Sequence, residues 1–359
     1  MNNISTTTIN PDVARLNAAR IGVQYIGQPL LFAIGTIGCI LNIAIFLRPS
    51  MRQNSCAIYF HASSWANLFC LTWGVLASML ATFTNNNPAT YNIGYCKIRF
   101  YMISFSQMSS RACVVLACLD RLLLCSRSPR KRLFCRPSVA IKVVLVTIFI
   151  CACLPIYILV TYEPQLLIRQ CLSMSQSVRT FEIVNLWVLT FGAPTLLMSI
   201  LSSLTIWRLK QNAKRIGRQK IQVRNKDIQL AGMLFGQVLL YIMTALPFAS
   251  NALYIILTQY DATSSKSPYR IAAEAFSQTL TSSFGIYVFN GLSFYVYTLT
   301  APSFRRELLL LILPRRWVIK LRQKEQHQMS LTNRMGPSLL DGTSINLKVM
   351  PRNVVATNF

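Results

Sequence analysis

Charged residues divide this sequence into long apolar stretches. Six stretches carry no Asp, Glu, Lys or Arg; the charges that flank them are Arg20 and Arg48, Arg52 and Lys97, Lys142 and Glu163, Glu182 and Arg208, Asp227 and Asp261, and Glu274 and Arg305. A seventh, between Arg99 and Arg127, is interrupted by Arg111 and by Asp120-Arg121. Because about 20 mostly apolar residues suffice for a helix to cross a bilayer, the pattern predicts seven membrane-spanning helices.

The predicted fold is an all-α membrane protein, a seven-transmembrane helix bundle over 22–300. We expect its helices at about 22–47, 55–83, 96–125, 138–161, 182–208, 227–258 and 273–300. Residues 301–316 are expected to form a short amphipathic eighth helix on the membrane surface, because Phe304, Leu308 and Leu311 share a helical face. We expect residues 1–21 to be an extracellular tail and 317–359 a disordered cytosolic tail.

The distribution of basic residues sets the expected orientation. With 53% hydrophobic residues and a mean hydropathy of +0.42, the chain belongs in a bilayer. Twenty-seven of the 36 Lys and Arg fall on one side of the predicted bundle and eight on the other. The positive-inside rule therefore predicts an extracellular N-terminus and a cytosolic C-terminus. The sequon at Asn3 then lies outside and is a candidate for glycosylation.

Several classes of function find no support. The net charge of +26 is divided among loops rather than gathered on one face, so nucleic-acid binding is not expected, and anionic membrane lipid is the expected neighbour. The two histidines, His61 and His327, lie in no His-Glu-x-x-His motif. We therefore predict no enzyme activity, no metal site and no cofactor.

Of the eleven cysteines, only Cys96 and Cys171 fall on the oxidising side of this topology. Disulfides persist in that environment, so these two are expected to pair. The bridge would close a loop of about 75 residues and contribute about 4 kcal/mol in the chain-entropy model. It would hold the second outer loop over the third helix.

Further motifs occur in a fixed order. Gly38 to Asn42 reads Gly-Cys-Ile-Leu-Asn, Asp120-Arg121-Leu122 ends the third helix, Pro194 and Pro247 lie in the fifth and sixth, and Tyr297 precedes Phe304 by seven residues. With these motifs the chain resembles the rhodopsin-like (class A) G-protein-coupled receptors over nearly all its length, among them the receptors for peptides. Asn42, Asn67, Pro194 and Pro247 match its helix-packing signature positions.

The resemblance implies a cell-surface receptor in the plasma membrane. An extracellular ligand would activate a heterotrimeric G protein through outward movement of helix six, with Asp120, Arg121, Asp227 and Tyr297 as the coupling and switch residues. Asp227 lies where this family often places an acid that holds the third-helix arginine, so we expect an Arg121–Asp227 latch. The alternative is an ordinary surface charge. Serines and threonines of the tail are candidate phosphorylation sites for arrestin recruitment.

The chain also departs from the family pattern. Asn67 stands where the second helix normally carries aspartate, Ser293-Phe294 replaces Asn-Pro, and Ala245 replaces a tryptophan. The family's sodium site is therefore not expected to work here.

Arg111 is an intramembrane charge about 14 Å deeper than Asp120 along the helix. Intramembrane charges normally have partners, and we expect Asn67, Asn290 or Ser293, or the ring face of Tyr241, to supply them. Arg111 either forms a polar knot without a signalling role, or replaces a sodium ion or binds an acidic ligand group.

The ligand is expected to be a peptide or another water-soluble chemosensory molecule. Ile103 lies where monoamine-binding members of the family carry an aspartate, so a monoamine is disfavoured. Acids such as Glu182 and Glu274 lie beside basic residues on the outer side, a mixed surface that suits peptides. The alternative from another class is a membrane transporter or channel, with a path lined by the polar residues of the seventh helix.

Overall fold

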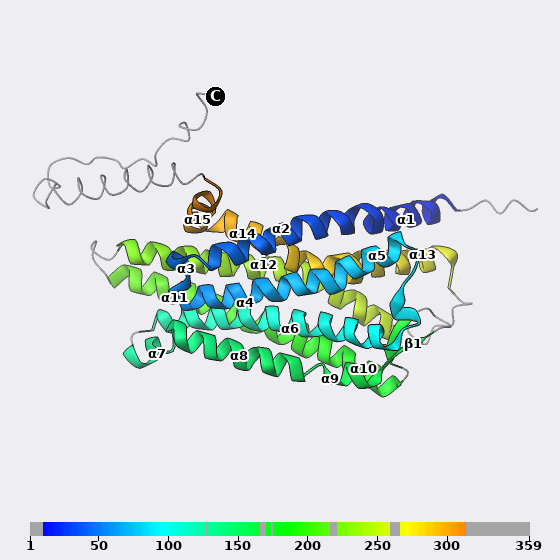
Figure 1. Cartoon of the computed structure of the whole chain (residues 1–359), viewed down its shortest axis with the longest axis horizontal. Helices are drawn as coiled ribbons and strands as arrows, with labels where there is room; N and C mark the ends of the chain where they lie inside the picture. The colour runs from blue at the N-terminus through cyan, green and yellow to red at the C-terminus, as the bar shows by residue number, and fades with distance from the viewer. Residues whose placement is uncertain are drawn as a thin grey trace, which may run out of the picture. The chain divides into compact units, whose positions relative to one another are not determined.

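A computed structural model of the chain describes residues 10–126, 128–165, 170–173, 175–215, 221–258 and 266–313. Within them, long helices lie side by side in one bundle that extends to Leu308 (Figure 1). The first four helical segments are α1 (Pro11–Gly22) with η1 (Val23–Gly27) and α2 (Gln28–Phe46), α4 (Ser55–Cys70) with η2 (Leu71–Leu76) and α5 (Ala77–Phe83), α6 (Ile93–Leu124), and α8 (Pro137–Cys153) with α9 (Ile156–Thr161).

The remaining segments complete the bundle. They are α10 (Gln176–Asn185) with η4 (Leu186–Gly192) and α11 (Ala193–Arg215), α12 (Ile221–Leu257), and α13 (Pro268–Gln278) with η7 (Thr279–Gly285) and α14 (Ile286–Thr300). Shorter elements connect or follow them: α3 (Pro49–Arg52), η3 (Pro88–Thr90), α7 (Pro129–Leu133), the strands β1 (Tyr162–Gln165) and β2 (Gln170–Ser173), and α15 (Pro302–Ile312). The strands form one antiparallel hairpin, in which Pro164 pairs with Cys171.

Six of the described segments are long and apolar enough to cross a membrane: Pro11–Phe46, Ser55–Phe83, Ile93–Leu124, Pro137–Thr161, Gln176–Leu209 and Gly232–Ile255. Large apolar side chains such as Phe149 and Val160, each 70% exposed, cover the outside of the bundle, as expected of a surface in contact with lipid tails. The seventh segment, α13 to α14, is interrupted by the polar run of η7.

The first helix begins at Pro11, well before the predicted start at residue 22. Asn10 caps it by accepting the Asp12 amide N–H at 3.0 Å, and Pro11 takes the first helical turn, where no amide donor is needed. Hydropathy alone misses this turn because Asp12, Arg15 and Arg20 interrupt the apolar pattern. The third, fifth, sixth and seventh helices also begin a few residues earlier than predicted.

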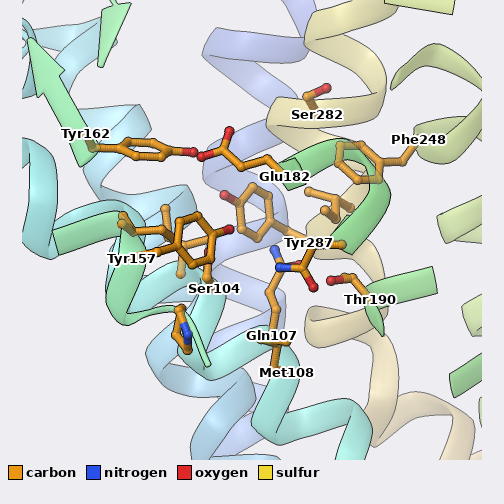
Figure 2. A pocket seen from close by; sticks show the side chains of 15 residues that line it. Ser104, Gln107, Met108, Tyr157, Tyr162, Glu182, Thr190, Phe248, Ser282 and Tyr287 are labelled. Atoms are coloured by element: carbon orange, nitrogen blue, oxygen red, sulfur yellow. The ribbon is translucent and has the colours of Figure 1, made fainter. Parts of the chain in front are cut away.

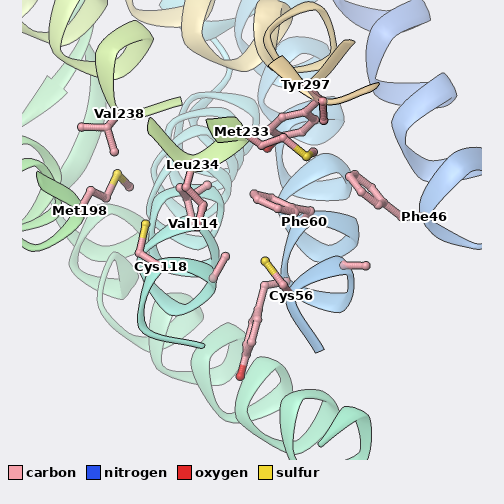
Figure 3. Close-up of a cluster of buried hydrophobic side chains, with 14 of the residues drawn as sticks. Phe46, Cys56, Phe60, Val114, Cys118, Met198, Met233, Leu234, Val238 and Tyr297 are labelled. Atoms are coloured by element: carbon pink, nitrogen blue, oxygen red, sulfur yellow. The ribbon is translucent and has the colours of Figure 1, made fainter. Parts of the chain in front are cut away.

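A cluster of buried apolar side chains joins all seven helical segments near the end of the bundle that holds Asp120 and Arg121 (Figure 3). Its aromatic centre is Tyr297 of α14, whose ring lies 4.9 Å from that of Phe60 and 5.9 Å from that of Phe304, measured between centroids. Phe304 is fully buried, so the start of α15 is held against the bundle.

Glycines allow α2 and α14 to pack closely. A Cβ added at Gly35 would lie 2.8 Å from Leu71 Cδ1 and 2.9 Å from the Gly291 Cα. Because the second neighbour is backbone, it cannot move aside as a flexible side chain can. Small residues at such crossings are typical of membrane helices, where close packing holds helices together.

We expect Gly35→Ala to destabilise the protein by roughly 1–3 kcal/mol, since the added methyl group would overpack this crossing. Gly22→Ala is the matched control in the same helical segment, because a Cβ there meets nothing within 4 Å. Thermal unfolding of both variants in nanodiscs should show a lower midpoint for Gly35→Ala only. Equal midpoints would show that the crossing is not tightly packed.

Candidate functional site

The predicted disulfide is present. Cys96, in the first turns of α6, is bonded to Cys171 of β2, with the two Cα atoms 5.8 Å apart. Both cysteines are buried and pack around Ala89. The bridge holds the β1–β2 hairpin against the end of α6, which we call the disulfide end of the bundle.

Beneath the hairpin lies a pocket of about 320 Å³, lined by side chains from helices three to seven and from β1 (Figure 2). Ile103 and Glu182, both predicted ligand-binding candidates, line it. A second pocket of about 350 Å³ adjoins it and shares Ile103, Ser282 and Tyr287 with it. The two pockets are therefore lobes of one chamber, which we call the ligand chamber.

The first lobe carries hydrogen-bond acceptors. Figure 2 shows the Tyr162 hydroxyl and the Glu182 carboxylate pointing toward one another. Burial, followed by the charge of Glu182, raises the pKa of Tyr162 above its usual range, so the phenol stays protonated and can donate. Glu182 Oε1 and Asn185 Oδ1 are buried without a hydrogen-bond partner among the described residues. This wall can therefore accept hydrogen bonds from a cationic group.

The second lobe carries a guanidinium. Arg99 lines it, one helical turn from Cys96. Its Nε donates to the Trp73 carbonyl at 3.3 Å, and its guanidinium carbon lies 5.9 Å from the centre of the Phe100 ring. The ligand chamber thus has an acidic group in one lobe and a basic group in the other, a polarity that suits a ligand carrying both charges.

Glu274, the third predicted ligand-binding candidate, does not line either lobe. Its carboxylate is paired with Lys266 at 2.8 Å and with Arg270 at 3.0 Å, and it accepts the Tyr254 hydroxyl at 2.8 Å. It therefore belongs to a cluster of charges beside the chamber. Arg99, Tyr162 and Asn185 are chamber residues that sequence reasoning missed, and of these only Arg99 carries a signal, its position one turn from the disulfide.

A polar network lies at mid-bundle and centres on Asn67 of α4. Asn67 Oδ1 accepts the Ser110 hydroxyl at 2.5 Å and the Asn290 amide at 2.8 Å, and Asn67 Nδ2 donates to Ser293 at 3.4 Å. Ser110 also contacts Ser63 at 3.1 Å. All five residues are buried. The network joins the second, third and seventh helices.

Arg111 is 3% exposed and lies one residue beyond Ser110. Its guanidinium carbon lies 5.3 Å from the centre of the Tyr241 ring and 6.0 Å from that of Phe289. Of the predicted partners, the ring of Tyr241 is therefore confirmed, whereas Asn67, Asn290 and Ser293 bond to one another. Arg111 Nε and Nη1 have no hydrogen-bond partner among the described residues.

At the opposite end of the bundle, Arg121 and Asp120 form a buried ion pair, with Arg121 Nη2 2.7 Å from Asp120 Oδ2. Arg121 Nη2 also donates to Asn54 Oδ1 at 2.6 Å. Asn54 Oδ1 also accepts a hydrogen bond from the Cys56 amide N–H. The same oxygen therefore caps α4 and binds the Arg121 guanidinium. Asp227 lies in α12, but its side chain falls outside the described residues, so the predicted Arg121–Asp227 latch is not tested.

Residues 38–289 match the family model of the seven-transmembrane receptors of the rhodopsin family. The chain belongs to this family. It is a multi-pass membrane protein built as a seven-transmembrane bundle, and membership implies a receptor that signals through G proteins. Members of the family are generally not enzymes. No curated protein matches the chain. Among the described residues, no group of three or more His, Cys, Asp or Glu could hold a metal ion.

The family's signature positions lie inside the receptor bundle. Asn42 is fully buried in α2, and its amide finds no hydrogen-bond partner among the described residues. Pro247 lies inside α12, and Pro194 is the second residue of α11. Since Pro194 has no N–H to donate, it cannot bond the Thr190 carbonyl, which accepts the Tyr241 hydroxyl instead.

The polar residues of the seventh helix do not support a channel reading of this receptor. Thr279 and Thr281 donate to carbonyls one turn back in their own helix, at 2.9 and 2.8 Å. Ser277 donates to Asn251 at 2.8 Å. These hydroxyls therefore donate hydrogen bonds to acceptors within the helix bundle.

We expect Asn54→Ala to destabilise the receptor more than Asn92→Ala. Both asparagines cap a helix, a contact worth about 1 kcal/mol. Only Asn54 also accepts from a guanidinium, which adds about 1.5–3 kcal/mol for a hydrogen bond to a charged group. Thermal unfolding in nanodiscs measures the difference. Similar losses in both variants would show that the Arg121 contact adds nothing to stability.

Proposed function

We propose that this receptor binds a peptide in the ligand chamber and transmits binding to a heterotrimeric G protein. The observation that carries the proposal is the polarity of the chamber. In one lobe, Glu182 Oε1 and Asn185 Oδ1 are acceptors without a partner in the described part of the chain, and Arg99 is a cation in the other lobe. A peptide amino group or basic side chain complements the first lobe, and a peptide carboxylate complements the second.

The proposed orientation places the disulfide end outside the cell and the Arg121 end in the cytosol. A disulfide at one end supports this, because disulfides persist in oxidising compartments. The excess of Lys and Arg on the other side supports it as well. Asn3, which lies outside the described residues, would then be available for glycosylation.

The proposed switch is an outward movement of the sixth helix that opens a cytosolic cleft for the G protein. Pro247 interrupts the hydrogen-bond ladder of α12, where such a movement can originate. Arg121 is held by Asp120 and Asn54, and we propose Asp227 as its further partner from α12. Tyr297 packs among Phe60 and Phe304 at the same end. We propose arrestin as a second cytosolic partner, through tail residues outside the described ones, and membrane lipid as the surface on which α15 lies.

The ligand proposal is tested by screening peptides for nucleotide exchange on a co-expressed G protein and measuring the half-maximal concentration of an active peptide. Glu182→Gln should raise that concentration roughly tenfold to hundredfold, since it removes a charge-assisted hydrogen bond. Glu274→Gln makes the same change outside the chamber and should leave the concentration nearly unchanged. Equal effects of the two variants would overturn the assignment of the site.

The switch proposal is tested by basal signalling at matched surface expression. Asp227→Ala should raise basal nucleotide exchange about fivefold, since a partly solvated ion pair contributes about 1 kcal/mol. Glu307→Ala is the matched control, because Glu307 pairs with Arg48 at 2.9 Å rather than with Arg121. Unchanged basal exchange in Asp227→Ala would refute the latch.

A further inference from the structure

A second cavity, distinct from the ligand chamber, lies between α6, α8 and the fifth helical segment. It has a volume of about 300 Å³ and an almost wholly apolar lining, and we call it the crevice. Leu154, Leu189 and Leu197 at its edge are 44–47% exposed on the surface that faces lipid tails. The one lining threonine, Thr147, already donates to the Val143 carbonyl at 2.7 Å. A ligand would therefore enter the crevice from the bilayer.

Arg111 is the only charged side chain among the described residues that line the crevice. Its side chain is 3% exposed, and Nε and Nη1 have no acceptor among the residues that the structure describes. The rings of Tyr241 and Phe289 lie against the guanidinium, and ring faces attract a cation but accept no in-plane hydrogen bonds. A buried cation with unused donors favours an anionic or carboxyl group as its partner.

The depth of Arg111 restricts the chemistry of that partner. It lies about 14 Å from Asp120 along α6, near the middle of the span. A permanently charged phosphate or sulfate headgroup is costly to bring to this depth. A carboxylic acid can enter the hydrocarbon region in its neutral form. Its oxygens can then accept hydrogen bonds from Nε and Nη1 of Arg111.

The volume restricts the size of the partner. The crevice has room for about ten water-sized groups of about 30 Å³ each. That space suits an alkyl chain of medium length rather than a whole lipid. We propose that the crevice binds a medium-chain carboxylic acid from the bilayer, with the carboxyl group at Arg111 and the alkyl chain along α8 and α11. This site is independent of the ligand and G protein proposed above.

Thermal stabilisation of the full-length receptor in nanodiscs tests the proposal, with decanoic acid as the probe and decanol as its uncharged match. We expect saturable stabilisation, with an apparent affinity for decanoic acid roughly tenfold to hundredfold above that for decanol. Arg111→Gln should remove this preference and leave similar affinities for both compounds. A wild-type receptor that does not distinguish the two compounds would overturn the proposal.

A second pair of variants keeps the test decisive if Arg111→Gln does not fold. Ala193→Leu fills the crevice and leaves Arg111 in place, so it should weaken decanoic acid binding at least about tenfold. Ala33→Leu makes the same change at an exposed position of α2 and should bind as the wild type does. A decanoic acid with a terminal diazirine should label α8 or α11 in the wild type. Undiminished binding to Ala193→Leu, or labelling elsewhere only, would refute the assignment.

Discussion

A bilayer offers no hydrogen-bond partners, so the polar groups inside this bundle must find partners in one another. Asn67 shows how the structure meets this constraint. The oxygen of its side-chain amide accepts two hydrogen bonds, and the nitrogen donates one. The partners belong to the third and seventh helices. Since these bonds have no competitor in hydrocarbon, they fix the register of three helices at mid-bundle.

The same constraint explains a second connection, among the third, fifth and sixth helices. Pro194 leaves the Thr190 carbonyl without its helical donor, and the Tyr241 hydroxyl of α12 supplies one. The ring of Tyr241 in turn lies against the guanidinium of Arg111. Met108, one turn before Arg111 on α6, lines both the ligand chamber and the crevice. Thr190 lines the ligand chamber and Arg111 lines the crevice, so the two cavities border opposite ends of this connection.

The features that could be predicted from the sequence depend on the length of the apolar stretches and on the side of the membrane on which each cysteine lies. Apolar stretches set the spans, and the side of the membrane selected Cys96 and Cys171 from eleven cysteines. The sequence could not separate Glu182 from Glu274, because both are acids near the start of a predicted helix. Only packing distinguishes them, since α13 directs Glu274 toward Lys266 and Arg270 whereas α10 brings Glu182 to Tyr162. The Asn54 contact with Arg121 was equally hidden, because 67 residues separate the two in the chain.

The position of Arg111 beside a neutral network is the last step in this reasoning. An aspartate at position 67 would place a carboxylate in the same layer of the bundle, where a neighbouring cation would be its natural counter-ion. With asparagine there, the amide is satisfied by Ser110, Asn290 and Ser293 and has no charge to offer. The guanidinium rests on aromatic rings, and two of its donors remain unused among the described residues. The replacement at position 67 thus leaves the buried cation available to an acid from outside the chain, which Ala193 and its neighbours leave room to receive.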